Sequence, residues 1–211
     1  MREAENLRVV DGPLLRQKLK VLRDEGTGTP EFRQAMRELS LIMVAEAAST
    51  MPTSTVRVRT PLAETEVEEI SHPVCLVPVL RAGLGMLEGA LALLPEATVG
   101  FMGLQRNEET AEPVEYYVNL PRRLHEYLVI VLDPMLATGG SLSATLGKLK
   151  EKGATWISCL HAVAAVPGVE RVTNEHADVN LYTAALDSEL DDNAFIVPGL
   201  GDAGDRLYGT L

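Results

Sequence analysis

Two short apolar runs, Val74–Leu80 and Tyr127–Leu132, constrain the fold of this chain more than any other feature of its sequence. Each run is nearly continuous in apolar residues, as is typical of a strand that is covered on both faces of a sheet. Each is followed by a short loop and then by leucines at helical spacing. Strands that alternate with helices form a mostly parallel sheet with helices on both faces. The sequence therefore predicts an α/β fold of that kind.

Further segments repeat this alternation, and we expect one domain over residues 1–211, with an N-terminal helical segment of about 1–52 packed on the core. Strands are predicted at Leu7–Val10, Thr53–Arg59, Thr98–Leu104, Trp156–Val166 and Val179–Ala185. Helices are predicted at Pro13–Arg23, from Thr29 as N-cap to about Thr50, from Gly83 to about Leu94, at Ser141–Lys152 and at Pro167–His176. Glu64–Ser71 is interpreted as a polar stretch. Val114–Asn119 is β-prone and predicts a hairpin with the strand before it.

The composition excludes several classes of partner. The formal net charge of −11 argues against non-specific nucleic-acid binding, which needs clustered Lys and Arg, and against an anionic membrane surface. No apolar segment follows the charged start of the chain, and the apolar stretches are shorter than a membrane span, so we expect a cytoplasmic protein. Cys75 and Cys159 lie in apolar runs and are expected to be buried free thiols. A site for a polyanion in this chain must therefore be positive only locally.

The stretch VIVLDPMLATGGS at Val129–Ser141 has the pattern of a phosphate-binding loop. A buried strand ends in Asp133, a tight turn with two glycines follows, and a helix then begins. The N-terminus of a helix presents free N–H groups and a partial positive charge, and the glycines let backbone amides approach an anion. Thr138 and Ser141 add hydroxyl donors, and the Asp133 carboxylate can accept hydrogen bonds from sugar hydroxyls. This pattern favours a sugar-phosphate ligand, although a plain turn with Ser141 as N-cap is an alternative interpretation.

Four segments of the chain, in order, resemble the motifs of type I phosphoribosyltransferases. The phosphate loop is similar to their loop for 5-phosphoribosyl-1-pyrophosphate (PRPP), and Pro134 after Asp133, where most of the family has a second acid, is characteristic of the uracil phosphoribosyltransferases. VLRAGLGM at Val79–Met86 resembles their pyrophosphate loop. Gln105–Pro121 resembles their mobile loop, and Phe195–Thr210 resembles their uracil-binding segment. The resemblance implies a type I phosphoribosyltransferase fold with a β-hairpin mobile loop.

The resemblance also implies a set of site residues. PRPP is expected to bind to Arg81, Arg106, Asp133, Pro134, Met135, Leu136, Ala137, Thr138, Gly139, Gly140, Ser141 and Asp202. Uracil is expected to bind to Ile196, Gly201, Asp202 and Ala203, mainly through their backbone. Asp133 and Asp202 are the candidate catalytic residues. Mg²⁺ is expected as the cofactor, carried by PRPP rather than held in a metal site of the protein.

These motifs together imply the reaction of uracil with PRPP to give UMP and pyrophosphate, a step of pyrimidine salvage. The resemblance further implies a homodimer or larger homo-oligomer and a possible effector, GTP. Two alternatives stay open: a phosphoribosyltransferase for another base, such as a purine or orotate, and a nucleotide-sensing regulator of the same fold. Arg81 read without the resemblance is a surface arginine at a strand end, and Asp202 is a turn-forming residue between glycines.

Overall fold

The computed structural model describes residues 6–106 and 113–210, with side chains of 104–115 left undescribed. Its main sheet has the strand order β1-β12-β10-β8-β4-β6-β7, with the short strand β5 also paired to β4. The strands are β1 Leu7–Val9, β4 Val74–Leu80, β5 Thr98–Val99, β6 Phe101–Arg106, β7 Pro113–Asn119, β8 Leu128–Leu132, β10 Trp156–His161 and β12 Asn180–Thr183. Neighbouring strands are parallel except β6 and β7. The predicted parallel sheet and the predicted hairpin are both confirmed.

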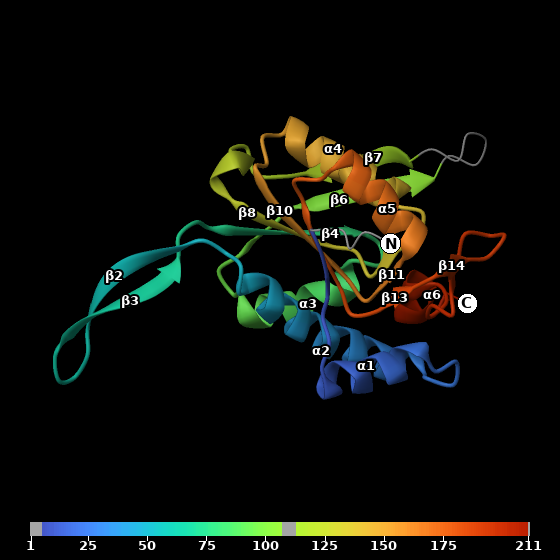
Figure 1. Ribbon diagram of the computed structural model, residues 1–211, viewed down its shortest axis with the longest axis horizontal. Coiled ribbons are helices and arrows are strands. Elements are labelled where there is room, and N and C mark those ends of the chain that lie inside the picture. The colour runs from blue at the N-terminus through green and yellow to red at the C-terminus, as the bar shows by residue number, and fades with distance from the viewer. Residues whose placement is uncertain (1–5, 107–112, 211) are drawn as a thin grey trace.

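Helices cover both faces of this sheet (Figure 1). One face carries α2 Thr29–Ala48 and α3 Leu84–Leu93, with α1 Pro13–Arg23 packed outside α2. The other face carries α4 Gly140–Glu151 and α5 Val166–Glu175. The central strands β4 and β8 are buried over almost their whole length, because helices lie on both sides of them.

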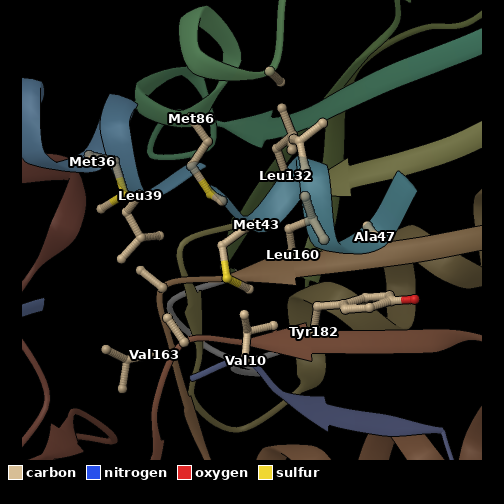
Figure 2. Packing of buried hydrophobic residues seen from close by; sticks show 14 of the residues in the cluster. Val10, Met36, Leu39, Met43, Ala47, Met86, Leu132, Leu160, Val163 and Tyr182 are labelled. Atoms are coloured by element: carbon tan, nitrogen blue, oxygen red, sulfur yellow. The ribbon is translucent and has the colours of Figure 1, made fainter. Parts of the chain in front are cut away.

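The core beneath α2 shows how the sheet and the N-terminal helices are joined. Met36, Leu39 and Met43 of α2 belong to the same buried cluster as Leu160 and Tyr182 of the sheet (Figure 2). These five side chains are at most 3% exposed. Burying an apolar side chain of this size contributes about 1.5–3 kcal/mol, so the helix stripe and the sheet stabilise each other.

A second, smaller sheet lies beyond the carboxyl ends of the main strands. It has the order β13-β11-β9, from Leu186–Asp187, Val163–Ala165 and Met135–Leu136, and all its pairs are parallel. The predicted strand Trp156–Val166 is thus two strands, since β10 ends at His161 and β11 begins at Val163. This small sheet joins three segments that follow strands of the main sheet, and it fixes their spacing.

One strand was not predicted from the sequence. Glu64–Ile70, taken as part of a polar stretch, forms β3 and pairs antiparallel with β2 Thr53–Arg59, in a two-stranded arm that projects from the body (Figure 1). All seven residues of β3 are exposed, so the strand has no apolar face that a periodicity could reveal. The sequence pattern did not indicate this strand, because hydrogen-bonded pairing with β2 alone defines it.

A helix start also differs from its prediction by one residue. The N-cap of α2 is Gly28, in an extended conformation, and Thr29 is already helical. No side chain caps this end, so the proposed hydroxyl cap of Thr29 was wrong. Pro30 still lies in the first turn, where its missing N–H costs nothing.

The structure describes both cysteines and bears on the question of membrane-spanning helices. Cys75 and Cys159 are free and buried, as predicted. Within residues 6–106 and 113–210, no helix is both long enough and apolar enough to cross a membrane. Burial raises the pKa of Cys75 to about 11, and it raises the pKa of Cys159 as well, so both thiols stay protonated at neutral pH.

Candidate active site

The two central strands end side by side, and their loops meet. β4 ends at Leu80 and leads into Arg81, while its neighbour β8 ends at Leu132 and leads into Asp133. A Cβ atom at Gly83 would lie 2.2 Å from the carbonyl oxygen of Leu132, so only glycine lets the two loops touch. The loops predicted to bind pyrophosphate and phosphate are therefore in backbone contact at the carboxyl edge of the sheet.

The phosphate loop encloses a small cavity of about 80 Å³. Its lining residues are Asp133, Met135, Leu136, Ala137, Thr138, Gly139, Gly140, Ser141 and Leu142. Gly139 has a φ of 78°, a left-handed conformation that glycine adopts without strain. α4 begins at Gly140 and points its N-terminus at the cavity, where unpaired N–H groups and the helix dipole favour an anion.

Ser141 does not cap this helix. The N-cap position belongs to Gly139, and no side chain accepts a hydrogen bond there. The alternative interpretation of TGGS as a turn with Ser141 as N-cap was therefore wrong. The arrangement leaves the first-turn amides of α4 to water or to a ligand.

α5 supports the phosphate loop from behind. A Cβ at Gly168 would lie 2.2 Å from the carbonyl oxygen of Ala137, and a Cβ at Gly139 would lie 2.9 Å from the carbonyl oxygen of Gly168. The backbones of α5 and of the phosphate loop are thus in direct contact, with Gly168 on one side and Gly139 on the other. Pairing of β9 with β11 holds the start of the same loop. The loop is consequently fixed by backbone packing rather than by its own side chains.

Asp133 combines access to the cavity with a desolvated carboxyl group. The residue is partly exposed and lines the cavity, but its carboxyl group lies within the protein. Burial raises the pKa of Asp133 from 3.8 to about 7, and a hydrogen bond from the backbone of Met135 opposes the shift. A ligand that brings positive charge or hydroxyl donors to this group favours the ionised form.

His161 holds the backbone of Asp133. Burial lowers the pKa of His161 to about 4, so the imidazole is neutral at pH 7. Its Nδ1 lies 2.6 Å from the carbonyl oxygen of Asp133, and a neutral ring donates the Nδ1–H to that oxygen. His161 is the buried last residue of β10.

Replacing Asp133 with Asn should change how stability depends on pH. A raised carboxyl pKa means that the folded chain binds this proton more tightly than the unfolded chain, so the free energy of unfolding falls as pH rises from about 4 to about 7. Asp133→Asn removes that contribution. Urea unfolding at pH 5 and pH 8 measures it, and the loss of stability between these values should be smaller in the variant. Equal losses in the two proteins would contradict the buried, proton-binding state of Asp133.

The backbone of Arg81 is held by a hydrogen bond, whereas its side chain is largely exposed. Its side chain is 60% exposed, and its Nη2 lies 3.6 Å from a carboxylate oxygen of Asp205. The Tyr208 hydroxyl donates to the carbonyl oxygen of Arg81 over 3.1 Å. Both partners come from α6 Ala203–Tyr208, so the C-terminal helix lies beside the Arg81 loop.

The C-terminal segment places its backbone in unusual conformations. Gly199 and Gly201 have φ values of 55° and 76°, both left-handed. Asp202 is the N-cap of α6, and its Oδ1 accepts from the N–H of Asp205 over 2.9 Å. Ile196, in β15 Ile196–Val197, and Ala203 are buried. Asp202 therefore has the structural role of a capping residue, whatever its contact with a ligand.

Comparison with known proteins decides the family. A family model described as "Uracil phosphoribosyltransferase" matches residues 9–210. The uracil phosphoribosyltransferase of Alkaliphilus oremlandii is 48% identical over 203 residues, which cover 96% of this chain and 97% of the relative. That of Bacillus cytotoxicus is 47% identical over 205 residues, which cover 97% and 98% of the two chains. The chain belongs to the uracil phosphoribosyltransferase family.

Two solved structures share the fold of this chain. A protein of Aquifex aeolicus superimposes with a TM-score of 0.90 at 37% identity, over 96% of this chain and 97% of the other. The adenine phosphoribosyltransferase of Trypanosoma brucei superimposes with a TM-score of 0.59 at 13% identity, over 92% and 89% of the chains. At that identity the likeness shows a shared fold alone. The predicted type I phosphoribosyltransferase architecture is confirmed.

The second arginine expected of a uracil phosphoribosyltransferase is only partly placed. Arg106 is the last residue of β6, paired with Pro113 of β7. Its side chain lies outside the described part of the structure, as do residues 107–112. Its expected contact with pyrophosphate therefore stays a prediction.

One cation near the phosphate loop gave no signal in the sequence. Arg171, on α5, has its Nη1 3.2 Å from the position that a Cβ at Gly140 would take. Its Nε lies 3.0 Å from a carboxylate oxygen of Glu175, four residues on. A cation beside the N-terminus of a helix opposes the helix dipole, unless an anion is bound there. Thirty-one positions separate Arg171 from Gly140, and no family motif of uracil phosphoribosyltransferases named it.

Removing the Arg171 charge should weaken phosphate binding without affecting the fold. We expect Arg171→Ala to raise the KM for PRPP severalfold, the effect of about 1 kcal/mol from a partly exposed charge. Steady-state kinetics with PRPP varied measures it. Arg16→Ala is the matched control, since Arg16 is exposed and pairs only with Asp11 among described carboxylates. Equal KM values in the two variants would mean that Arg171 does not reach the phosphate.

Proposed function

We propose that this chain transfers the phosphoribosyl group of PRPP to N1 of uracil, giving UMP and pyrophosphate in pyrimidine salvage. The observation that carries the proposal is the meeting of the Arg81 loop, the Asp133 loop and the C-terminal segment at one edge of the sheet, in a chain of the uracil phosphoribosyltransferase family. Each loop suits a different part of the two substrates.

PRPP fits the two loops that end β4 and β8. Its 5-phosphate is proposed to bind in the cavity at the N-terminus of α4, where residues 137–141 offer amides and hydroxyls. The ribose hydroxyls then face Asp133, whose carboxylate accepts hydrogen bonds. Arg81 neutralises charge on the pyrophosphate, and its exposed tip lets it turn from Asp205 toward a ligand. The remaining loop positions, Pro134, Met135 and Leu136, shape the turn between these contacts.

Uracil fits the C-terminal segment through backbone groups. Its edge presents O2, N3–H and O4, which pair with amide donors and a carbonyl acceptor from Ile196, Gly201 and Ala203. Cytosine exchanges a donor and an acceptor on that edge, and backbone groups cannot reverse their polarity. Each mismatch leaves a buried group unpaired, at a cost of about 1–3 kcal/mol. Asp202, at the head of α6, is proposed to lie near the base and the ribose.

The reaction needs little covalent help from the protein. N1 of uracil displaces pyrophosphate at the anomeric carbon, through a transition state that resembles an oxocarbenium ion. The chain contributes orientation of the two substrates, neutralisation of the leaving group and exclusion of water. Asp202 is further proposed to help receive the proton that leaves N1 of uracil.

Mg²⁺ is proposed to arrive with the pyrophosphate of PRPP. Magnesium prefers a few carboxylates together with substrate phosphates and water. Asp133 at the cavity is a suitable carboxylate, whereas the described residues contain no group of three or more His, Cys, Asp or Glu that could hold a metal ion. The ion supplies charge neutralisation on the leaving group.

Formation of UMP from radiolabelled uracil, PRPP and Mg²⁺ tests the proposal. We expect turnover of uracil and almost none of cytosine, hypoxanthine or orotate. No turnover of uracil, or equal turnover of cytosine, would contradict it.

A binding assay with RNA at increasing salt concentration tests the alternative function, a nucleotide-sensing regulator, since phosphate-dominated binding weakens steeply with salt. Salt-sensitive RNA binding without uracil turnover would favour the regulator.

Other expectations from the sequence stay predictions. These are a homodimer or larger assembly, an effect of GTP, a cytoplasmic location and a single domain. The oligomeric state is measured by sedimentation, and the GTP effect by the same UMP assay.

A further inference from the structure

Two arginines, one from α1 and one from α6, hold the backbone that immediately precedes Gly201. Arg23, the last residue of α1, donates from Nη1 to the carbonyl oxygen of Gly199 over 2.8 Å. Arg206, on α6, donates from Nη1 to the carbonyl oxygen of Leu200 over 2.9 Å. Two consecutive carbonyl groups are thus pinned, immediately before the proposed uracil contact at Gly201.

A buried carboxylate holds the guanidinium of Arg23 in place. Asp187, at the end of β13, accepts both terminal nitrogens of Arg23, each over 2.8 Å. The same carboxylate accepts the N–H of Gly199 over 2.9 Å. The Asp187 side chain is only 8% exposed, so these bonds are poorly screened by water. Gly199 is held at both its N–H and its C=O.

The guanidinium of Arg206 is held by the C-terminal end of α1. The Arg206 guanidinium also donates to the carbonyl oxygens of Leu22 and, over 2.6 Å, of Asp24. It stacks 4.3 Å above the ring of Phe32, a fully buried residue of α2. One planar group therefore satisfies the open carbonyls at the C-terminus of α1 and the carbonyl of Leu200 together.

Peptide geometry means that the hydrogen bond from Arg206 to Leu200 also sets the direction of the next N–H group. The Leu200–Gly201 bond is trans, since the cis bonds of the described chain lie at Leu80–Arg81 and Val197–Pro198. In a planar trans peptide the C=O and the following N–H point in opposite directions. Fixing the Leu200 carbonyl on Arg206 therefore fixes the Gly201 N–H away from α1. A Cβ at Gly201 would lie 3.7 Å from Cδ of Arg206, so this arginine also backs the residue itself.

We propose that Arg206, assisted by Arg23 and Asp187, is a positioning residue that aims the Gly201 amide at uracil and so sets the preference for uracil over cytosine. The inference rests on the proposed function, because it concerns the base of that reaction. The small sheet adds a second consequence. β13, which carries Asp187, belongs to the same sheet as β9 of the phosphate loop, so the base loop is positioned against the phosphate loop through backbone pairing.

Arg206→Lys is the decisive variant. Lysine keeps the charge but cannot hold three carbonyls with one planar group. We expect the KM for uracil to rise about tenfold or more, the KM for PRPP to change less than about twofold, and the uracil-to-cytosine ratio of kcat/KM to fall. The assay is steady-state UMP and CMP formation with each substrate varied.

Arg33→Lys is the matched control. Arg33, on α2, donates from Nε to the carbonyl oxygen of Leu207 over 2.5 Å, so it binds the other end of α6 in the same way. Its hydrogen bond lies at Leu207, six residues beyond Gly201. We expect it to lower the melting temperature without changing the uracil KM or the cytosine ratio.

Arg23→Lys decides the question if the Arg206 variant does not fold. A lysine there still pairs with Asp187 but cannot bind both carboxylate oxygens and the Gly199 carbonyl, so the same selective rise in the uracil KM is expected. The proposal is overturned if a folded variant keeps the uracil KM and the cytosine ratio, or if both substrate KM values rise in parallel. Absence of uracil turnover by the unmodified protein overturns the proposed function itself, whereas normal turnover with an unchanged ratio in the variants overturns only this inference.

Discussion

Replacing Arg81 with alanine is expected to lower kcat by about two to three orders of magnitude, the usual effect of removing one preorganised donor from a developing negative charge. Arg81 follows the central strand β4, in the loop whose Gly83 contacts the end of β8 just before Asp133. Its side chain is 60% exposed, so its loss removes little packing. The melting temperature and the circular dichroism spectrum should therefore remain those of the unmodified protein.

Arg123→Ala is the control for this experiment. Arg123 is also exposed and also forms an ion pair, at 2.8 Å to Glu126, but it precedes β8 and lies at the opposite end of that strand from Asp133. Its kcat should stay within about twofold of the unmodified value. A comparable loss in both variants would mean that Arg81 acts through the overall charge of the surface and not on the leaving group.

Gly168→Ala is expected to disturb the phosphate loop strongly. The added Cβ would lie 2.2 Å from the carbonyl oxygen of Ala137, which is backbone and cannot rotate away. Either α5 or the loop must move, at a cost of about 1–3 kcal/mol. We expect the KM for PRPP to rise more than about tenfold, because the amides that face the phosphate move with the loop.

Gly147→Ala is the matched control, since it adds the same atom to a helix of the same layer. Nothing lies within 4 Å of the Cβ that it would carry. It should raise stability by about 0.5–1 kcal/mol, through the better helix propensity of alanine, and leave both KM values unchanged. Urea unfolding and PRPP kinetics on the two variants separate the clash from the propensity. An unchanged PRPP KM in Gly168→Ala would show that the loop tolerates the shift.

A buried strand, its terminal acid and the glycine turn after it are continuous in the chain. The sequence alone therefore predicted the parallel sheet, the phosphate loop at Val129–Ser141 and the family resemblance, because each depends on residues that are local neighbours. Apolar runs and turn residues report local conformation and burial directly. The same logic failed for β3, which has no apolar face and exists through pairing with β2.

Only the tertiary structure decided which distant residues complete the site. Gly168 and Arg171 reach the phosphate loop from the next helix, and Arg23, Asp187 and Arg206 hold the base segment from three separate elements. None of these contacts has a fixed spacing in the sequence, because side chains meet across the fold at separations set by the packing of the sheet and its helices. The sequence determined where the glycine loop after β8 lies and which family the chain resembles. The fold determined which arginines and glycines give the loops their shape, since a backbone amide is aimed by whatever holds the carbonyl on its other side.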